Sequence, residues 1–408
     1  MARVKDAVGL DIGTSGVRAA HLGFAKHPPT LENFGQVAVP GGALREGEIT
    51  DMETVAQALS ELWKRAHFTS KNVRLGLANQ KVVARPIDLP FMDEQELRGA
   101  IQYQVQEHIP MPVEDAVLDF KILEDFTNER GEHLIRVLVV AAGKEMINSF
   151  VETVTKAGLS PAAIDFTPLS LIRSLGEGRD ALGRPGGGGE ALIDVGAGVT
   201  SLVVHEGGIP RLARVLSIGG NSLTDALAAG LGVSFDDADN IKQRLGLSSG
   251  ETYMPVAQPG AYSDPSQAAA PGQVAAPAYQ VPIDPGAAPA QTLTQQSGGY
   301  GAAGSGDMAG RILEQRVGAF VDQIRQSMDY YMAQPGAARI ARVVLCGGAS
   351  KLPNLGPRLA NAIRLPVEQG RPLSRLRMGR KLKLSESQLV DAEPLMAAAV
   401  GTALGAIS

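Results

Sequence analysis

The chain has one cysteine, six histidines, few aromatic residues and no excess of positive charge. Cys346 has no partner for an internal disulfide, which suits a reducing compartment such as the cytoplasm. The histidines show no metal-ligand spacing, and there is no Cys/His cluster that could hold zinc. The formal net charge of −5 provides no general attraction for nucleic acid. These absences exclude a disulfide-stabilised secreted domain and a zinc protein, and they argue against a nucleic-acid binder.

Long apolar runs are also missing. No stretch reaches the roughly 18 uncharged apolar residues that a membrane-spanning helix needs, and the first residues lack the apolar core of a signal peptide. The alanine-rich tail 394–407 is short and contains Gly401 and Gly405, which predicts a helix packed tightly against another backbone. With 408 residues, the chain is long enough for two or more domains. We therefore expect a multidomain cytoplasmic protein.

Two short segments repeat one pattern, in which an apolar strand delivers an aspartate, a glycine, small residues and a second apolar strand. Residues 8–16 read Val-Gly-Leu-Asp-Ile-Gly-Thr-Ser-Gly, and residues 191–200 read Ala-Leu-Ile-Asp-Val-Gly-Ala-Gly-Val-Thr. Backbone N–H groups at such a turn attract phosphate oxygens, and the aspartate can hold magnesium through water. Glycine is needed where a phosphate approaches the backbone closely. Two copies predict two similar half-molecules that face one nucleotide.

Two further segments end a strand in a pair of glycines and then begin a helix. One is 343–350, with Gly347-Gly348, and the other is 215–224, with Gly219-Gly220. The N-terminus of a helix that follows such a strand can face phosphates or ribose. A helix is also predicted at 235–242, where Asp239 and Lys242, considered alone, are ordinary solvated charges.

Residues 81–163 have a pattern of their own. Strands are predicted at 82–89, 117–122 and 134–141, and a helix at 144–156. A further helix is predicted from Asp93 to Ile109, because Asp93 and Glu96 have capping-box spacing and Pro110 follows. Its apolar stripe has a four-residue spacing and consists of Leu97, Ile101, Val105 and Ile109. We expect a small α+β subdomain inserted into the first half-molecule, which otherwise comprises 1–80 and 164–188.

Two stretches are predicted to be linkers. The glycine-rich residues 176–189 read as a flexible crossing to the second half, 189–408. Residues 246–310 consist mainly of Ala, Pro, Gly, Gln and Ser, with no Lys or Arg between Arg244 and Arg311. Such a sequence buries too little surface to offset the entropy of ordering, so we predict a disordered insertion there. Helices are predicted on either side of the 343–350 strand, at 311–333 and 351–364, and a last one at 393–404.

A basic run lies between the last two helices. It consists of Arg371, Arg375, Arg377, Arg380, Lys381 and Lys383. Two interpretations stay open: a solvated surface loop, or a contact for an acidic partner or for anionic lipid headgroups.

The two aspartate hairpins and the later Gly-Gly strand, in this order, resemble the first phosphate, second phosphate and adenosine motifs of the actin-like ATPase superfamily. That superfamily includes actin, the seventy-kilodalton chaperones and sugar kinases. The resemblance implies an α/β chain with a duplicated actin-like (RNase H-like) fold. It also raises the expectation that Asp239 and Lys242 approach a ribose and an adenine.

Within this superfamily the sequence of residues 84–119 is similar to that of the inserted, SHS2-like subdomain of the PilM family of type IV pilus assembly proteins. The matching segments are Ala84-Arg85-Pro86-Ile87-Asp88-Leu89-Pro90, His108-Ile109-Pro110-Met111-Pro112-Val113-Glu114-Asp115 and Leu118-Asp119. Residues 193–197 and 345–349 also fit that family. The resemblance covers nearly the whole chain except the 246–310 insertion, which is a departure with no assigned role.

The PilM resemblance implies that ATP and Mg²⁺ bind between the two halves, with the magnesium held through water by Asp11 and Asp194. It implies the following nucleotide-binding residues: Asp11, Gly13, Thr14, Ser15, Asp194, Gly196, Ala197, Thr200, Gly219, Gly220, Asp239, Lys242, Gly347 and Gly348. No residue can be assigned to orient the attacking water, since Gln102 and Glu107 read as helix-surface residues. We therefore expect slow ATP hydrolysis or none.

The family also implies a role and partners. A PilM-like chain is expected to act in type IV pilus assembly and twitching motility as a cytoplasmic scaffold. It would bind the cytoplasmic N-terminal peptide of the inner-membrane protein PilN at the inserted subdomain, and link it to motor ATPases. Membrane association would then be indirect, and self-association stays open. ATP that touches both hairpins would favour a closed state and so tune peptide affinity.

Three alternatives carry the same nucleotide motifs. A sugar kinase also needs a catalytic base and a sugar pocket, and a chaperone ATPase needs a substrate-binding β domain. A division protein of the FtsA type, or another actin-like filament, is the nearest alternative. FtsA normally ends in an amphipathic membrane helix, and the tail 394–408 lacks the basic face that such a helix requires.

Overall fold

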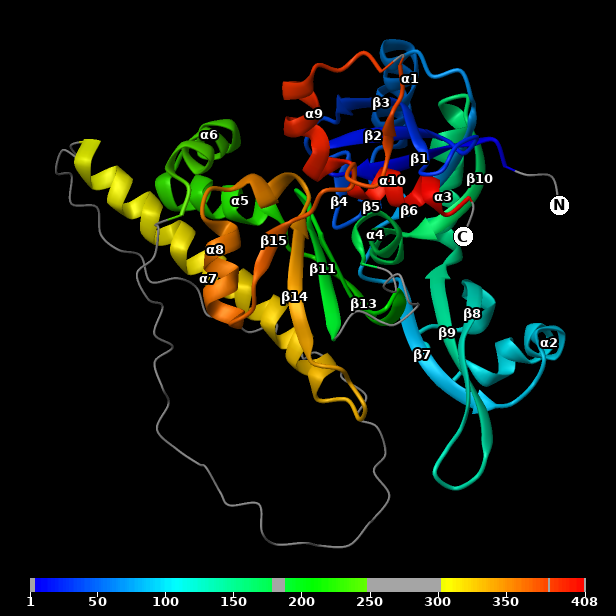
Figure 1. Cartoon of the computed structure of the whole chain (residues 1–408). Helices are drawn as coiled ribbons and strands as arrows, with labels where there is room; N and C mark the ends of the chain where they lie inside the picture. The colour runs from blue at the N-terminus through cyan, green and yellow to red at the C-terminus, as the bar shows by residue number, and fades with distance from the viewer. Residues whose placement is uncertain (1–3, 178–187, 248–301, 381, 407–408) are drawn as a thin grey trace, which may run out of the picture.

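The computed structural model describes residues 4–177, 188–247, 302–380 and 382–406. Two sheets whose strands follow the same topology form the framework of the protein (Figure 1). The first has the order β10-β6-β1-β2-β3-β16 and the second β13-β12-β11-β14-β15. In each, three antiparallel strands from consecutive hairpins continue into two parallel strands. The predicted duplicated α/β fold is therefore confirmed.

The first half is built around the hairpin of β1 and β2, and α1 covers one face of its sheet. Asp51 caps α1 by accepting a hydrogen bond from the Thr54 N–H. The strands of the first half are β1 (Asp6–Gly13), β2 (Gly16–Gly23), β3 (Thr30–Ala38), β6 (Asn72–Leu77) and β10 (Ser160–Phe166), together with the short pair β4 (Leu44–Arg45) and β5 (Glu48–Ile49). Its helices are α1 (Met52–Ala66), α3 (Lys144–Lys156) and α4 (Thr167–Leu175).

The inserted subdomain, below the first half in Figure 1, is a three-stranded sheet with the order β7-β9-β8 and one helix packed on it. Its elements are β7 (Val83–Pro90), α2 (Glu94–Gln104), the 3-10 turn Val113–Asp115, β8 (Ala116–Thr127) and β9 (His133–Gly143). The predicted capping box of Asp93 and Glu96 is present. One prediction was wrong, since α2 ends at Gln104 and not at Ile109. Pro110 disfavours helical geometry only at the residue before it, whereas the C-cap of α2 is Val105, five residues before the proline. Val105 and Ile109 are nevertheless both buried.

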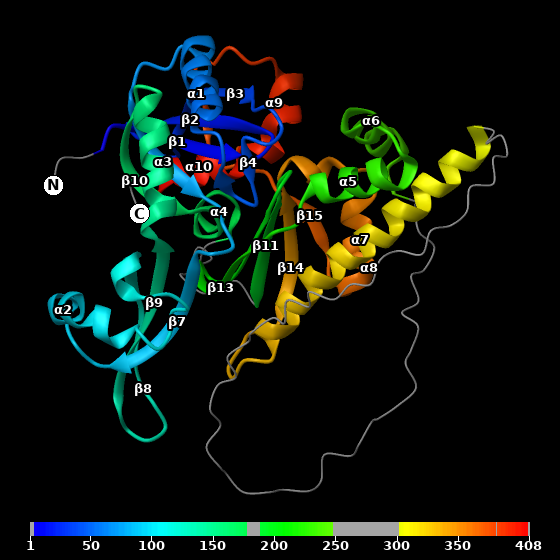
Figure 2. The ribbon, with the colours of Figure 1, turned by 180° about the vertical axis from the view of Figure 1, so that it is seen from behind.

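The second half places helices α5, α7 and α8 on the outer face of its sheet, and Figure 2 shows the long α7 lying across that face. Its strands are β11 (Gly189–Val195), β12 (Thr200–Glu206), β13 (Ile209–Leu216), β14 (Ile340–Cys346) and β15 (Val367–Gln369). Its helices are α5 (Gly220–Leu231), α6 (Phe235–Leu245), α7 (Ala302–Met332), the 3-10 turn Gly348–Lys351 and α8 (Leu355–Ile363).

The ends of the predicted disordered insertion, 246–310, are ordered. Leu247 is buried and its N–H donates to Pro353 O, while α7 already begins at Ala302 and buries Ala309. Small residues give little sequence signal for a helix, but Ala309 gains its order from packing in the second core. The rest of that prediction, at 248–301, lies outside the described residues, as does most of the predicted crossing at 178–187.

The last part of the chain returns to the first half, although the sequence analysis placed all of 189–408 in the second. Strand β16 (Arg377–Met378) pairs with β3, in parallel. Beyond it come α9 (Glu386–Ala392), the 3-10 turn Glu393–Leu395 and α10 (Ala397–Leu404). The predicted tight packing of the tail is confirmed, because a side chain at Gly9 of β1 would overlap Ala399 O of α10. None of the helices within the described ranges is long and apolar enough to cross a membrane.

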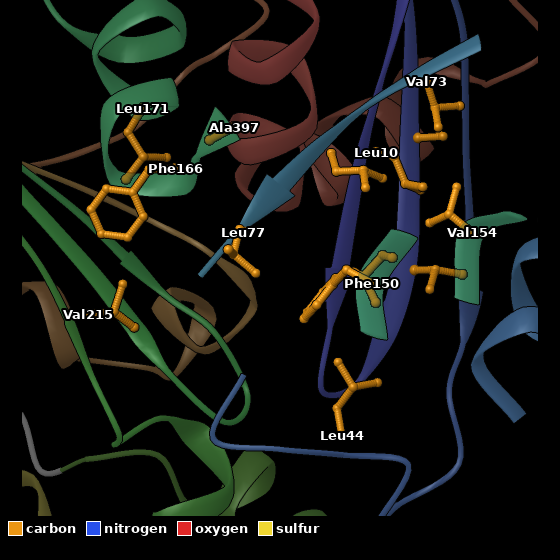
Figure 3. Packing of buried hydrophobic residues seen from close by; sticks show 14 of the residues in the cluster. Leu10, Leu44, Val73, Leu77, Phe150, Val154, Phe166, Leu171, Val215 and Ala397 are labelled. Carbon is orange, nitrogen blue, oxygen red and sulfur yellow. The ribbon is translucent and has the colours of Figure 1, made fainter. Parts of the chain in front are cut away.

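One apolar core joins the two halves. Leu10 and Val73 of the first sheet, Phe150 and Val154 of α3, and Leu171 of α4 belong to it together with Val215 of the second sheet (Figure 3). Helix α4 thus packs against both sheets. Because this core includes residues of both halves, the two halves pack directly against each other beside the space described next.

Candidate functional site

A cavity of about 670 Å³ lies where the two aspartate hairpins face each other. This volume is within the usual range for small-molecule sites. Most of the predicted nucleotide residues line it: Asp11, Gly13, Thr14, Ser15, Asp194, Gly196, Ala197, Gly220, Asp239, Lys242, Gly347 and Gly348. Segments far apart in sequence, from β1 to the end of β14, therefore converge on one space.

The two hairpins touch at their turns. A Cβ atom at Gly198 of the second hairpin would lie 3.1 Å from Thr14 Cβ of the first and would overlap the Thr14 hydroxyl. A side chain at position 198 would therefore force Thr14 to move, and glycine avoids this clash. Residues of both turns line the cavity between them, and turns of this kind can attract phosphate oxygens through backbone N–H groups.

Arg18 lies beside the first aspartate. It pairs directly with Asp11 in the β1–β2 register, and its Nη1 lies 3.3 Å from Asp11 Oδ2 while its Nη2 donates to Ser15 Oγ at 3.3 Å. Sequence reasoning missed this residue. A signal was present, because a two-residue turn closed by Gly13 and Gly16 places the residues at 11 and 18 opposite each other.

The two carboxylates are largely buried, with the Asp11 side chain 18% exposed, and the charge of Asp11 acts on Asp194. Burial, the largest cause, and the negative charge of Asp11 together raise the pKa of Asp194 to about 7, although the charge of Arg18 acts against both. Burial also raises the pKa of Asp11, although the charge and hydrogen bond of Arg18 act against it. Two buried carboxylates next to one guanidinium leave a region that a further cation would stabilise.

Gly347 at the end of β14 forms the wall behind Asp194. Its φ angle is +88°, and a Cβ atom there would overlap Asp194 Oδ1 and lie 2.5 Å from Val195 O. Its N–H donates to Pro394 O. This position therefore tolerates only glycine. Gly348 is less restricted, since a Cβ atom there would meet only Leu395 Cδ2, at 3.3 Å.

Lys242 and Asp239 belong to a hydrogen-bonded cluster on the α5–α6 side of the cavity. Lys242 Nζ donates to Asp239 Oδ1 at 2.5 Å, to Thr224 Oγ1 at 2.6 Å and to Gly220 O at 3.3 Å. Burial of Asp239 opposes its ionisation, but the hydrogen bonds and charge of Lys242 outweigh it and lower the pKa of Asp239. The cluster fixes α6 against the N-terminus of α5.

Two predicted site residues do not line the cavity. Thr200 is fully buried and its hydroxyl donates to Ile218 O at 2.7 Å, so it holds the strand that leads to α5. Gly219 lies behind the surface, where a Cβ atom would be 2.5 Å from Ala197 O. Gln102 and Glu107 are exposed on the inserted subdomain and do not border the cavity. Lining residues that sequence reasoning missed, besides Arg18, include Phe235, Gln243 and Lys351.

Comparisons with known proteins agree with this architecture. The family model described as type IV pilus assembly protein PilM matches residues 9–259, more than half of the chain. The family model of cell division protein FtsA matches residues 191–401. Both matches include the second hairpin, and both place the chain in the actin-like ATPase superfamily.

A solved structure named "PilM-PilN type IV pilus biogenesis complex" has a TM-score of 0.73 to this chain at 24% identity, covering 100% of this chain and 99% of that one. The FtsA of Streptococcus pneumoniae is 25% identical over 63% of this chain and 58% of its own length. The FtsA of Escherichia coli K12 is 24% identical over 60% of this chain and 62% of its own length. The chain thus spans about three fifths of these relatives.

Proposed function

The chain belongs to the PilM family of type IV pilus assembly proteins, and on this premise we propose that it is an ATP-binding scaffold of the pilus machine. It docks the cytoplasmic N-terminal peptide of a PilN-type protein, and through that protein it is held at the inner face of the inner membrane. Motor ATPases on the cytoplasmic side are its further partners in this proposal. The observation that carries it is the pair of duplicated hairpins whose aspartates, Asp11 and Asp194, line one cavity.

The residues of this cavity fit a nucleotide triphosphate. Thr14 and Ser15 line the cavity with hydroxyl groups at one hairpin, and Ala197 lines it at the other, where its backbone N–H is the proposed phosphate donor. The Gly196 N–H already donates to Val199 O within the second hairpin. Arg18 supplies a guanidinium that can hold phosphate oxygens in a forked geometry. We assign the ribose and base to Asp239, Lys242, Gly347 and Gly348, which line the same cavity.

Magnesium fits the same residues. In the described part of the chain, no group of three or more His, Cys, Asp or Glu side chains forms a metal cage. Mg²⁺ usually keeps several waters and binds through one or two carboxylates plus substrate phosphates. Asp11 and Asp194 meet that requirement when a nucleotide is bound, and a metal there would supply charge that offsets their burial.

In this proposal the site serves binding more than turnover. Lys242 already has three acceptors of its own. No lining side chain within the described ranges is assigned to orient an attacking water, and hydrolysis requires such a group. We expect slow ATP hydrolysis or none, with the nucleotide acting as a clamp between the halves.

Peptide docking is proposed at the inserted subdomain. The similar solved chain comes from a complex named for PilM and PilN, and the inserted sheet β7-β9-β8 contacts the second half through β7 and β13. Nucleotide-driven closure of the halves can therefore reach the subdomain mechanically.

The second candidate is a division-type filament, which the FtsA family match at 191–401 favours. Binding and sedimentation experiments distinguish it from the scaffold. The full chain is titrated with ATP and with a synthetic PilN-type N-terminal peptide, and its sedimentation is followed with and without Mg-ATP. Saturable binding of both ligands by a non-polymerising chain supports the scaffold. ATP-dependent polymers that do not bind the peptide support the filament and contradict the scaffold.

A further inference from the structure

One basic stretch plays no part in the nucleotide site. Six cationic residues lie between Gln369 and Ser385 with no Asp or Glu among them, in a chain whose net charge is −5. They are Arg371, Arg375, Arg377, Arg380, Lys381 and Lys383. Lys381 lies outside the described residues, and the other five are all exposed. We call these five residues the basic strip.

The fold holds the strip in a fixed position. Leucines alternate with the cations, and Leu373, Leu376, Leu382 and Leu384 pack into the cluster formed by β2, β3 and α10. Strand β16 pairs with β3, and the Gly379 N–H donates to Leu31 O at 2.9 Å. Anchored leucines therefore turn the cations toward solvent along the edge of the first sheet, at the end opposite β10.

The positive charge of the strip is not neutralised within the described residues, where none of its members forms an ion pair. Arg375 and Arg377 donate instead to the backbone oxygens of Gly176 and His27. Arg342 shows the contrast, because it contacts Glu177, Glu190 and Glu368. Of the carboxylates nearby, Glu368 contacts Arg342, and Glu393 accepts a hydrogen bond from the Leu373 N–H. Glu32 of β3 lies beside Gly379, and Glu386 begins α9. Within the described residues, none of these carboxylates forms an ion pair with the strip.

The surroundings of the strip add to its positive charge and provide an apolar contact. Lys26 and His27 are exposed in the turn before β3, directly beside β16. Met378, between Arg377 and Gly379, has 44% of its surface exposed. Cations around an exposed apolar side chain suit a membrane surface, where the cations meet headgroups and the apolar side chain enters the interface.

Other partners fit the strip less well. A nucleic-acid site uses aromatic side chains that stack on bases, and residues 371–383 contain none. An acidic peptide that adds a strand needs a longer free edge than the two residues of β16. The strip is also spread along an edge, which suits many weak headgroup contacts.

We propose that the basic strip binds anionic lipid headgroups, so that the chain touches the membrane directly as well as through a partner protein. This inference is independent of the nucleotide site. Each cation near an anionic surface contributes about 1 kcal/mol, or roughly fivefold in affinity. Removing three of them is expected to weaken binding by about a hundredfold.

The test is sedimentation of the full chain with vesicles of phosphatidylcholine alone or mixed with phosphatidylglycerol. The variant is the triple substitution Arg371→Ala, Arg380→Ala and Lys383→Ala. The matched control removes the same charge at exposed positions elsewhere, Arg45→Ala, Lys71→Ala and Lys121→Ala. Polyglutamate, added as a soluble competitor, represents an acidic protein partner.

We expect salt-sensitive binding to the mixed vesicles only, lost in the strip variant and kept in the control. Equal loss in both variants would mean that net charge decides binding, which overturns a local site. No binding to either vesicle overturns the proposal as well. Tight binding to polyglutamate by a chain that ignores the vesicles would assign the strip to an acidic protein instead.

Discussion

Glu124 of the inserted subdomain and Arg211 of the second half form an ion pair, with Oε1 and Nη2 2.5 Å apart. Each member of this pair also contacts a further charged residue of its own domain. Arg136 contacts both Glu124 and Asp88 within the subdomain, and Arg211 also contacts Glu206. Glu206 in turn accepts a hydrogen bond from the Tyr331 hydroxyl of α7, at 2.6 Å. This chain of contacts connects the proposed peptide-binding subdomain with the half that carries Asp194.

Arg211→Ala should uncouple nucleotide from peptide. Because the ion pair joins two bodies that closure would move together, its loss should leave each ligand bound but shrink the effect of one on the other. Allosteric coupling is typically about 1–3 kcal/mol, and we expect most of it to disappear. Calorimetric titration of each ligand, with and without the other, measures this.

The control for that variant is Arg65→Ala, which removes an exposed ion pair with Glu61 on α1. Its coupling should equal that of the unmodified chain. Coupling that survives intact in Arg211→Ala would show that the halves communicate by another route.

Gly347→Ala should weaken nucleotide binding. A Cβ atom at this position would overlap Asp194 Oδ1, and the φ angle of +88° disfavours any side chain. Displacing Asp194 should reduce ATP affinity by at least about tenfold, the equivalent of roughly 1.4 kcal/mol. Gly348→Ala is the matched control, because its Cβ atom meets only a flexible leucine end. Equal ATP affinity in the two variants would contradict the placement of the wall.

Asp194→Asn should stabilise the ligand-free protein at high pH. The folded-state pKa of Asp194 is about 7, above its ordinary value of 3.8, so the folded chain binds more protons than the unfolded chain between these values. The contribution of this group to the free energy of unfolding therefore falls as pH rises from about 4 to about 7. The neutral amide removes that loss.

Urea unfolding at about pH 5 and about pH 8 measures the effect. We expect the asparagine variant to gain on the order of 1–3 kcal/mol over the unmodified chain at the higher pH, and much less at the lower. A gain that is the same at both pH values would show that Asp194 is not the titrating group.

Arg18→Ala should weaken ATP binding by removing the guanidinium next to Asp11. Hydrogen bonds to charged groups contribute about 1.5–3 kcal/mol, which predicts a loss of roughly ten- to a hundredfold in ATP affinity. Adenosine, which has no phosphate, should bind both forms equally well. An equal loss for adenosine would indicate general damage to the fold.

The nucleotide hairpins were predictable because the aspartate, the glycines and the turn lie within a few residues of each other. The capping box of Asp93 and Glu96 was predictable for the same reason. Arg18 required the strand register to be worked out as well. Phe235 and Lys351 gave no signal, since only the packing of α6 and of the turn after β14 brings them to the cavity.

The return of the chain to the first half was not predictable. Strand β16 has two residues, and its pairing with β3 joins positions more than three hundred residues apart. The order of 302–310 was missed for a related reason, because alanine and glycine carry no periodic signal and Ala309 gains its burial from distant residues of the second core.

The most direct test of the scaffold is calorimetric titration of the full chain with a PilN-type N-terminal peptide, with and without Mg-ATP. The account predicts saturable peptide binding that strengthens about five- to a hundredfold when ATP is bound. Peptide affinity that is unchanged by ATP, in a chain that binds ATP, would contradict the nucleotide clamp. Absence of peptide binding in both conditions would contradict the scaffold itself.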